Sequence, residues 1–388
     1  MGKSRCAAPL KRCAMPIATA NPKKIFIYCE SWAQGGIETF LAHTLEYMDC
    51  SGMQIELACA EKQTSRLDEE LAAIGLSVRT LVDGKERSAL RRTIAALLPF
   101  ARRCRRERYD VVHLNVFHGV ALLLALVARL NGVHHVIVHC HGAGFRSGHG
   151  EKTKIFVHHF FCKLLAWTPT ERWAASERAG RFMFGSRSVR IIPNGVDVKK
   201  FRFDPQERQK LRADLKVEDR LVFGCVGRMD TQKNQAFLLP LFEQLQKSEY
   251  KPLLLLFGDG EEYASLKLEI EKMGITESAR LMGISSEVHR WMWAMDALLV
   301  PSTSEGLGIV VIEGQAAGLP VLCSTGVPQE TKLTQNVQFL SLESPDQWLK
   351  AMKKVPVTDR LKMNREIEES RYDIRKSAAM VRAGYLAE

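Results

Sequence analysis

The stretch DALLVPSTSEGLGIVVIEGQAAGLPVLCS, residues 296–324, decides the fold class of this sequence. It begins as an apolar strand, passes through a loop that contains glycine, continues as a helix over 309–317 and ends in a second apolar strand. The alternation of apolar strands with amphipathic helices is typical of a parallel sheet that helices cover on both faces.

The same alternation extends through both halves of the chain. In the second half, the other predicted strands are RLVFGCVGR (220–228), PLLLLFGDG (252–260) and ARLMGI (279–284). In the first half, they are KKIFIYCE (23–30), MQIELACA (53–60), LSVRTLV (76–82), YDVVHLNVF (109–117) and HHVIVHCHG (134–142). Helices are predicted at 37–48, 66–74, 88–108, 121–131, 234–247, 261–273 and 287–295. The sequence therefore predicts an α/β fold of two doubly wound, Rossmann-like domains that face a central cleft.

The boundary between the two domains is predicted within VRIIPNGVD, residues 189–197, where Pro-Asn-Gly signals a turn. A polar, charged segment follows it. We expect a disordered basic lead-in over 1–23, a first domain over 24–193, a second domain over 194–365, and a C-terminal helix over 366–388 that packs back on the first domain.

Composition and charge restrict the class of protein. With 388 residues, 46% of them apolar, the chain can bury two separate cores. Its longest uncharged apolar run, 119–128, is about half the length of a membrane-spanning helix. Residues 1–190 carry an excess of 12 positive charges, whereas residues 191–388 carry an excess of one negative charge. This asymmetry indicates that the first half faces something anionic.

The ten cysteines contain no C-x-x-C pair. Five of them lie in apolar runs that are predicted to be strands: Cys29, Cys59, Cys140, Cys225 and Cys323. We therefore expect buried free thiols in a reducing cytosol, with neither a zinc site nor a redox role. Residues 1–23 lack the continuous apolar core of a signal peptide.

Two glutamates, Glu305 and Glu313, mark the first candidate site. Glu305 lies in the loop after a predicted strand, and Glu313 lies in the first turns of the following helix. The start of a helix offers free backbone N–H groups and the positive end of the helix dipole, which suit an anion. An isolated pair of glutamates is more often a helix cap and a surface acid, but the surrounding E-G-x-G-x-x-x-x-E pattern favours a site.

GRMDTQKN, residues 227–234, supplies the second candidate site. Arg228 and Lys233 follow a central strand, and Asn234 is in position to cap the next helix. Two cations at the carboxyl end of a strand suit a diphosphate, and a solvated basic loop is the alternative. GDGEE, residues 258–262, resembles part of a nucleotide-binding glycine turn but lacks the third glycine.

The first half offers two further candidates. Gly35 and Gly36 open a helix after the first strand, where backbone amides can approach a phosphate, although a plain tight turn explains them equally well. His141 follows another predicted strand, and a single histidine at such a place is more often structural.

In this order and on these strand ends, the motifs resemble those of the retaining glycosyltransferases of family four, which have the glycosyltransferase-B (GT-B) architecture. The resemblance covers residues 24–340 and is greatest to the bacterial branch that builds capsular and extracellular polysaccharides. Its motifs here are GGIE (35–38), HG (141–142), IPNGVD (192–197), the GR…KN loop (227–234) and EGxxxxxxE (305–313).

The resemblance implies transfer of a hexose-type sugar from a nucleotide-diphosphate donor to a growing glycan or lipid-linked acceptor, with retention at the anomeric carbon. By likeness, Arg228 and Lys233 hold the diphosphate, and Glu313 accepts hydrogen bonds from the ribose hydroxyls. Glu305 and His141 lie beside the donor sugar as the catalytic pair.

The remaining positions implied by the resemblance are donor-binding Gly35, Gly36, Gly306, Leu307 and Gly308, and acceptor-side His118 and Arg146. No metal is expected, since such sites meet the diphosphate with cationic side chains and the sequence has no Asp-x-Asp pair. Two alternatives stay open: a non-hydrolysing sugar-nucleotide epimerase, and a donor-binding protein without turnover. A nicotinamide enzyme is disfavoured because no full G-x-G-x-x-G opens either half, and nucleic-acid binding because aromatic residues do not interleave with the arginines.

The basic first half also predicts that the protein is cytoplasmic and that it associates peripherally with the anionic inner face of the cell membrane. The arginines are Arg102, Arg103, Arg105, Arg106 and Arg108, preceded at helical spacing by Leu90, Ile94, Leu97, Leu98 and Ala101. A second patch, KTKIFVHHFFCKLL (152–165), brings Phe156 and Phe160 close to Lys154 and Lys163. The alternative is that the apolar stripe faces the core and that Pro99 breaks the helix.

Overall fold

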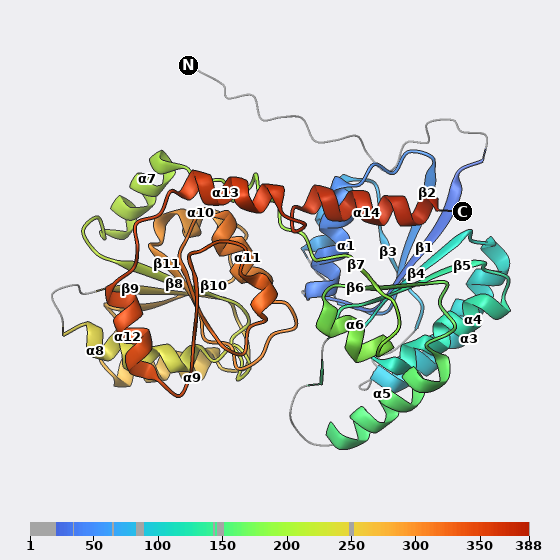
Figure 1. Ribbon diagram of the computed structural model, residues 1–388, viewed down its shortest axis with the longest axis horizontal. Helices are drawn as coiled ribbons and strands as arrows, with labels where there is room; N and C mark the ends of the chain where they lie inside the picture. Colours follow the sequence, from blue (N-terminus) through green and yellow to red (C-terminus); the bar gives the residue numbers. More distant parts are fainter. Residues whose placement is uncertain are drawn as a thin grey trace, which may run out of the picture. The chain divides into compact units, whose positions relative to one another are not determined.

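The computed structural model describes residues 21–33, 35–63, 66–82, 89–142, 144–145, 151–247 and 252–387 (Figure 1). The chain divides into two compact units. Unit 1 comprises Met1–Gly195 together with Ile374–Glu388, and unit 2 comprises Val196–Asp373. The division after Gly195 lies two residues beyond the predicted boundary, and the C-terminal segment from Ile374 belongs to unit 1.

Unit 1 contains a seven-stranded sheet in which every pair of neighbours is parallel, with the order β3-β2-β1-β4-β5-β6-β7. The strands are β1 (Lys23–Trp32), β2 (Met53–Lys62), β3 (Val78–Thr80), β4 (Val111–Val116), β5 (His135–Cys140), β6 (Glu171–Ala174) and β7 (Arg190–Ile191). The strand order reverses between β1 and β4, which is the doubly wound arrangement.

Helices cover both faces of this sheet. They are α1 (Gly36–Tyr47), α2 (Leu67–Ala73), α3 (Ala89–Glu107), η1 (Gly119–Ala121), α4 (Leu122–Leu130), α5 (Glu151–Leu165), α6 (Glu177–Phe184) and α14 (Ile374–Leu386). Alternate residues of β1 show the two cores: Phe26 packs with α3 to α6, whereas Ile25 packs with α1, α2 and α14. A strand that is buried on both faces reads as a continuous apolar run, which is why the sequence reveals it.

Unit 2 contains a six-stranded parallel sheet with the order β10-β9-β8-β11-β12-β13. Its strands are β8 (Val222–Val226), β9 (Leu253–Phe257), β10 (Ala279–Gly283), β11 (Ala297–Val300), β12 (Val321–Ser324) and β13 (Val337–Leu340). Its helices are α7 (Pro205–Leu215), η2 (Gln235–Phe237), α8 (Leu238–Leu245), α9 (Tyr263–Lys272), α10 (Val288–Ala294), α11 (Ile309–Ala316), η3 (Gln329–Thr331), α12 (Pro345–Lys353) and α13 (Arg360–Glu369). Helices α8, α9 and α12 cover one face of the sheet, and α10, α11 and α13 pack on the other. The α/β prediction with two doubly wound sheets is therefore confirmed.

Several elements differ from the prediction. The polar segment after the boundary contains α7, which Asp204 caps by accepting from two backbone N–H groups and which begins with Pro205. The predicted C-terminal helix is two helices, α13 and α14, separated at residues 370–373. Pro99 does not break α3, because Ala96 and Phe100 on either side of it are fully buried in the core and hold the helix together.

Cys29, Cys59, Cys140, Cys225 and Cys323 are buried free thiols, as the sequence predicts. Burial raises the pKa of Cys140, Cys225 and Cys323 to about 12, so these thiols are unreactive at neutral pH. Among the described residues, no helix is both long enough and apolar enough to cross a bilayer.

Candidate active site

The carboxyl ends of β8 and β11 lie side by side in unit 2, at the point where the strand order reverses. The loop after β8 carries Arg228 and Lys233, and the loop after β11 carries Glu305. Doubly wound sheets bind ligands at such a reversal, outside the carboxyl ends of the strands. The topology thus places two stretches that are 72 residues apart in sequence at one edge of the sheet.

Lys233 and Glu305 form an ion pair, with Lys233 Nζ 2.7 Å from Glu305 Oε1. Ser302 Oγ donates a second hydrogen bond to the same carboxylate oxygen, also at 2.7 Å. The Glu305 side chain is 8% exposed and that of Lys233 is 24% exposed. Because an ammonium group has three N–H donors, Lys233 can bind phosphate oxygens while it still holds Glu305.

Arg228 is oriented by Asp230, a buried acid that the sequence analysis does not assign. Arg228 Nε donates to Asp230 Oδ2 at 2.7 Å, and the backbone N–H of Lys233 donates to Asp230 Oδ1 at 2.9 Å. Just over half of the Arg228 side chain is exposed, 55%, so its guanidinium can reach an anion. An acid placed two residues after one cation and three before the other is the sequence signal for this role.

Asn234 does not cap a helix with its side chain, contrary to the prediction. It adopts a left-handed backbone conformation with φ of 55°, and its side-chain amide donates to the Pro301 carbonyl oxygen at 3.2 Å. Thr303 N also donates to the Gln232 carbonyl oxygen, at 2.8 Å. These bonds fasten the loop after β8 to the loop after β11, which fixes the separation of Lys233 and Glu305.

The GDG turn after β9 serves backbone packing. A Cβ atom at Gly258 would lie 2.0 Å from the Gly227 carbonyl oxygen, and one at Gly260 would lie 2.3 Å from the Met229 carbonyl oxygen. Both glycines have positive φ. Met229 N donates to the Asp259 carbonyl oxygen at 2.9 Å, so this turn supports the loop that carries Arg228.

The stretch from Gly306 to Gly308 leads into α11. Gly308 precedes the helix with φ of +78°, a conformation that glycine adopts without strain. The Leu307 side chain is buried in the core of unit 2, so only its backbone can face a ligand. The predicted roles of these three residues in donor binding stay predictions.

Glu313 lies in the second turn of α11 and is partly exposed. Among the described residues, its carboxylate forms neither a hydrogen bond nor an ion pair, unlike that of Glu305. Desolvation raises the pKa of Glu313 to about 7, and the positive charges of Lys200 and Lys233 oppose this rise. A carboxylate with free acceptor sites suits hydroxyl donors of a ligand.

In unit 1, His141 directly follows β5 and is partly exposed, although its Nδ1 atom is buried. Its Nε2 lies 3.0 Å from Asn115 Oδ1. Burial lowers its pKa to about 3, an effect that Asn194 opposes by hydrogen bonding, so the imidazole is neutral at pH 7. A neutral imidazole can exchange hydrogen bonds with a sugar hydroxyl but brings no positive charge.

His141 ends a column of three histidines that the sequence analysis does not predict, and the other two, His113 and His139, are fully buried. The rings of His139 and His141 are 4.1 Å apart, and those of His113 and His139 stack at 5.5 Å. His113 Nδ1 lies 2.6 Å from the hydroxyl of Tyr385 in α14. Burial lowers the pKa of His113 and of His139 as well, so the column is uncharged.

His118 and Glu30 form a buried pair at the ends of β4 and β1, with His118 Nε2 3.1 Å from Glu30 Oε2. Burial lowers the pKa of His118, but the charge of Glu30 and a hydrogen bond with it outweigh this effect and raise the pKa overall. The pair lies beside the reversal point of the sheet, and the predicted acceptor role of His118 stays a prediction. Arg146 lies outside the described residues.

Gly35 and Gly36 begin α1, but a carboxylate already occupies that helix terminus. A Cβ atom at Gly35 would lie 2.4 Å from Glu38 Oε2, and Ser31 Oγ donates to Glu38 Oε1 at 3.3 Å. Burial raises the pKa of Glu38, while hydrogen bonds from the backbone and Ser31 oppose the rise. A phosphate at this terminus has to meet Glu38 in its neutral form or displace it.

Two family models match the chain. Residues 35–195 match the model described as "Glycosyl transferase 4-like domain", and residues 207–369 match "Glycosyl transferases group 1". The first range lies in unit 1 and the second in unit 2. The chain is a family-four GT-B glycosyltransferase. The alternative of an epimerase is not favoured, because both matches describe glycosyltransferases.

Curated relatives agree with this assignment. This glycosyltransferase is 27% identical over 336 residues to the putative glycosyltransferase EpsF of Bacillus subtilis, a match that covers 84% of this chain and 85% of EpsF. It is 25% identical over 302 residues to the UDP-Gal:alpha-D-GlcNAc-diphosphoundecaprenol alpha-1,3-galactosyltransferase of Escherichia coli, covering 74% of this chain and 76% of the relative.

Among solved structures, HepE of Anabaena in complex with UDP and glucose superimposes on the glycosyltransferase with a TM-score of 0.74 at 18% identity. The match covers 93% of this chain and 98% of HepE. At this identity the likeness shows the fold, which is GT-B.

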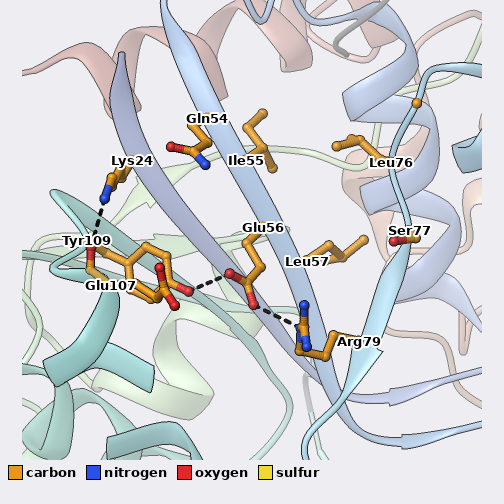
Figure 2. Close-up of a pocket in the computed structure, with 11 residues that line it drawn as sticks. Lys24, Gln54, Ile55, Glu56, Leu57, Leu76, Ser77, Arg79, Glu107 and Tyr109 are labelled. Atoms are coloured by element: carbon orange, nitrogen blue, oxygen red, sulfur yellow. Dashed lines mark hydrogen bonds and ion pairs between the residues drawn. The ribbon is translucent and has the colours of Figure 1, made fainter. Parts of the chain in front are cut away.

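A cavity of about 410 Å³ in unit 1 of the glycosyltransferase lies away from these residues, toward the amino ends of β1 and β2 (Figure 2). Glu56 in its wall accepts from the Tyr109 hydroxyl at 2.6 Å and pairs with Arg103 and Arg79. Because its main acid is fully paired and sits at the edge opposite the loops, we assign no catalytic role to this cavity.

Proposed function

We propose that this glycosyltransferase moves a hexose-type sugar from a nucleotide-diphosphate donor to a growing glycan or a lipid-linked acceptor, with retention of configuration at the anomeric carbon. The observation that carries the proposal is the Lys233–Glu305 pair beside Arg228 at the reversal point of unit 2. Two cations suit the diphosphate of the donor, and the carboxylate suits the hydroxyls of its sugar.

The reaction follows from this charge arrangement. The bond between the anomeric carbon and the diphosphate oxygen breaks, and the leaving diphosphate gains negative charge. Arg228 and Lys233 are already held in place by Asp230 and Glu305, so they stabilise that charge more in the transition state than in the ground state. The N-terminus of α11 adds backbone N–H groups at the same edge.

The acceptor supplies the new bond. Its hydroxyl oxygen bonds to the anomeric carbon on the face that the diphosphate leaves, and its proton passes to a departing phosphate oxygen. In this proposal Glu305 holds hydroxyls of the donor sugar, and Glu313 accepts from the ribose hydroxyls. His141 binds the donor sugar as a neutral imidazole, and His118 lies on the acceptor side. No metal is needed to balance the charge, since side-chain cations meet the diphosphate.

The relatives support the nature of the substrates. HepE is a structural neighbour in complex with UDP and glucose, which supports a nucleotide sugar as donor. The Escherichia coli relative acts on a sugar linked to diphosphoundecaprenol, which supports a lipid-diphosphate-linked acceptor in polysaccharide synthesis. Such an acceptor requires the enzyme to work at the inner face of the cell membrane, as a peripheral protein.

A panel of nucleotide sugars tests the proposal. We expect at least one to raise the melting temperature of the protein by mass action and, with an acceptor extract, to release its nucleoside diphosphate. The product linkage, read by nuclear magnetic resonance, should keep the anomeric configuration of the donor. An inverted product contradicts retention. Donor binding without transfer to any acceptor instead supports a donor-binding protein without turnover.

A further inference from the structure

Helix α3 has a second apolar stripe besides the one in the core. Ala96, Phe100 and Cys104 are fully buried against the sheet, as an amphipathic helix requires. On another side of the same helix, Leu90, Ile94 and Leu98 are spaced by four residues and are 41%, 54% and 57% exposed. A helix that is apolar on two sides has a face for which the described fold provides no cover.

Helix α5 repeats this arrangement. Phe156, Phe160 and Leu164 are also spaced by four residues, and they are 72%, 54% and 53% exposed. Trp167, just beyond the helix, is 63% exposed. Exposed phenylalanine and tryptophan side chains are costly in water, and aromatic residues are typical of surfaces that contact another phase or partner.

The two stripes belong to one layer of unit 1. Helix α4 packs against both α3 and α5, and all three cover the same face of the sheet (Figure 1). Both stripes therefore lie on this one helical layer, with α4 between them. We call the exposed residues of the two stripes the apolar ridge: Leu90, Ile94, Leu98, Phe156, Phe160 and Leu164.

Exposed cationic side chains lie on the same two helices as the apolar ridge. Arg102 and Arg105 on α3 and Lys152, Lys154 and Lys163 on α5 are exposed. The few acids do not balance them: Glu107, the one acid of α3, pairs with arginines of its own helix. The sequence analysis predicts that Arg103 faces the membrane with the other arginines. In the structure it is instead bound to Glu56 through two hydrogen bonds, so it is not available for a partner.

The positive charge beside the apolar ridge indicates which kind of partner can bind there. A second copy docking through the same ridge would bring two sets of cationic side chains together, which like-charge repulsion opposes. An anionic lipid surface attracts the cationic side chains and accepts the apolar and aromatic side chains below the headgroups.

We propose that unit 1 docks on an anionic lipid bilayer through the apolar ridge, which inserts at the level of the headgroups while the exposed lysines and arginines of the same helices bind lipid phosphates. This deepens the proposed function, on which it rests for its purpose, because a lipid-linked acceptor lies in such a bilayer. The anchoring thus has an electrostatic part and an apolar part. Salt weakens the attraction of the arginine cluster, because it screens the charges, whereas the insertion of apolar side chains persists at high salt.

Co-sedimentation with vesicles tests the proposal on the full chain. We expect the protein to bind vesicles of equal parts phosphatidylcholine and phosphatidylglycerol more strongly than vesicles of phosphatidylcholine alone. Raising the salt from about 0.1 M to about 1 M should weaken binding without abolishing it. The double variant F156S/F160S should partition at least about tenfold less, because it removes two side chains that insert.

Two exposed apolar residues of unit 2, Leu268 and Ile284, provide the matched control. The variant L268S/I284S should bind vesicles like the wild type. Both variants should keep the melting temperature and the nucleotide-induced shift, which separates loss of docking from loss of donor binding. Equal vesicle binding by F156S/F160S and the wild type overturns the proposal. So does equal binding to both kinds of vesicle, or a ridge-dependent dimer that does not bind vesicles.

Discussion

The carboxyl edges of the two sheets are built differently, although both units are doubly wound. In unit 2, the candidate residues are bonded to one another and partly open, as in the Lys233–Glu305 pair and the exposed guanidinium of Arg228. In unit 1, the candidates are bonded to residues outside the candidate set: the partly exposed His141 to Asn115, and the buried His118 to Glu30. The edge of unit 2 thus presents charges that are held in place and accessible, whereas the candidate side chains at the edge of unit 1 are neutral apart from the His118–Glu30 pair.

This difference follows from the chemistry that each edge is proposed to perform. Leaving-group stabilisation requires cations that are fixed in advance but accessible to phosphate oxygens. A neutral histidine can both donate hydrogen bonds to sugar hydroxyls and accept hydrogen bonds from them. The predictions below test whether the two edges divide the work in this way.

The largest effect is expected from Lys233→Ala. Removing the ammonium takes away one of the two cations that are proposed to bind the diphosphate, and it leaves the buried Glu305 without its ion-pair partner. Turnover at saturating donor should fall at least about 100-fold, which corresponds to about 2.7 kcal/mol of transition-state stabilisation. Steady-state kinetics of sugar transfer provides the measurement. Lys267→Ala, an exposed lysine of α9 in the same unit, is the control and should retain full activity.

A smaller effect is expected from the ionisation of Glu313, which should make the affinity for a nucleotide sugar depend on pH. Its pKa is about 7, so the carboxylate is ionised only in part at neutral pH. Hydroxyl groups bind the ionised form better, so the affinity for a nucleotide sugar should rise about tenfold between pH 6 and pH 8. Titration calorimetry at several pH values measures this slope. The slope should vanish in Glu313→Gln, and a slope that survives there removes Glu313 from the ribose role.

In unit 1, the histidine column predicts sensitivity to acid. The pKa of each of the three histidines is lowered by burial, to about 3 for His141, so below about pH 6.5 the unfolded chain binds protons that the folded chain excludes. Stability should therefore fall as the pH drops from about 6.5 toward the lowered values, by about 1.4 kcal/mol per pH unit for each histidine.

His139→Phe isolates this contribution. The phenyl ring keeps the aromatic contacts with Phe40 and Trp173 but cannot take up a proton. The variant should lose less stability than the wild type between pH 7 and pH 5 in thermal unfolding experiments. If the melting temperature falls by the same amount between pH 7 and pH 5 in the variant and in the wild type, His139 does not contribute to the acid sensitivity.

No effect is expected from excess chelator. In the proposed function the diphosphate is met by Arg228, Lys233 and the N-terminus of α11, so sugar transfer should proceed at an unchanged rate. The assay is the same transfer reaction with and without chelator. Activity that disappears with chelator and returns with magnesium contradicts this part of the account.

The sequence predicts the strands of both sheets well because most are buried on both faces and read as apolar runs, as in 252–260. It does not reveal β6, whose ERWA sequence is short and half polar. Helix α7 is missed for another reason. Its Arg208 and Arg212 bind Asp296 and the backbone carbonyls at the end of α10, and such long-range contacts leave no periodic pattern.

For the site, the sequence predicts which residues flank the reversal point of unit 2 but not how they are bonded. The spacing of Lys233 and Glu305 in the sequence does not predict their ion pair, which forms because β8 and β11 are neighbours in the sheet. The sequence analysis misses Asp230 and the histidine column. An acid in a basic loop is common, and histidines on neighbouring strands are far apart in the sequence, so neither pattern indicates a contact. The sequence also identifies apolar residues of α3 and α5, but it does not show which of them are exposed and which lie in the core.

The most direct test of the donor edge is a comparison of diphosphate and monophosphate binding. We would titrate matched pairs, UDP with UMP and GDP with GMP, into the wild type and into the double variant R228A/K233A. The account predicts that the wild type binds the diphosphate of its nucleotide more tightly than the monophosphate. In the double variant, which should remain folded, the ratio of these two affinities should fall at least about 100-fold. An equal preference in both proteins would show that the diphosphate is bound elsewhere, and would contradict the account.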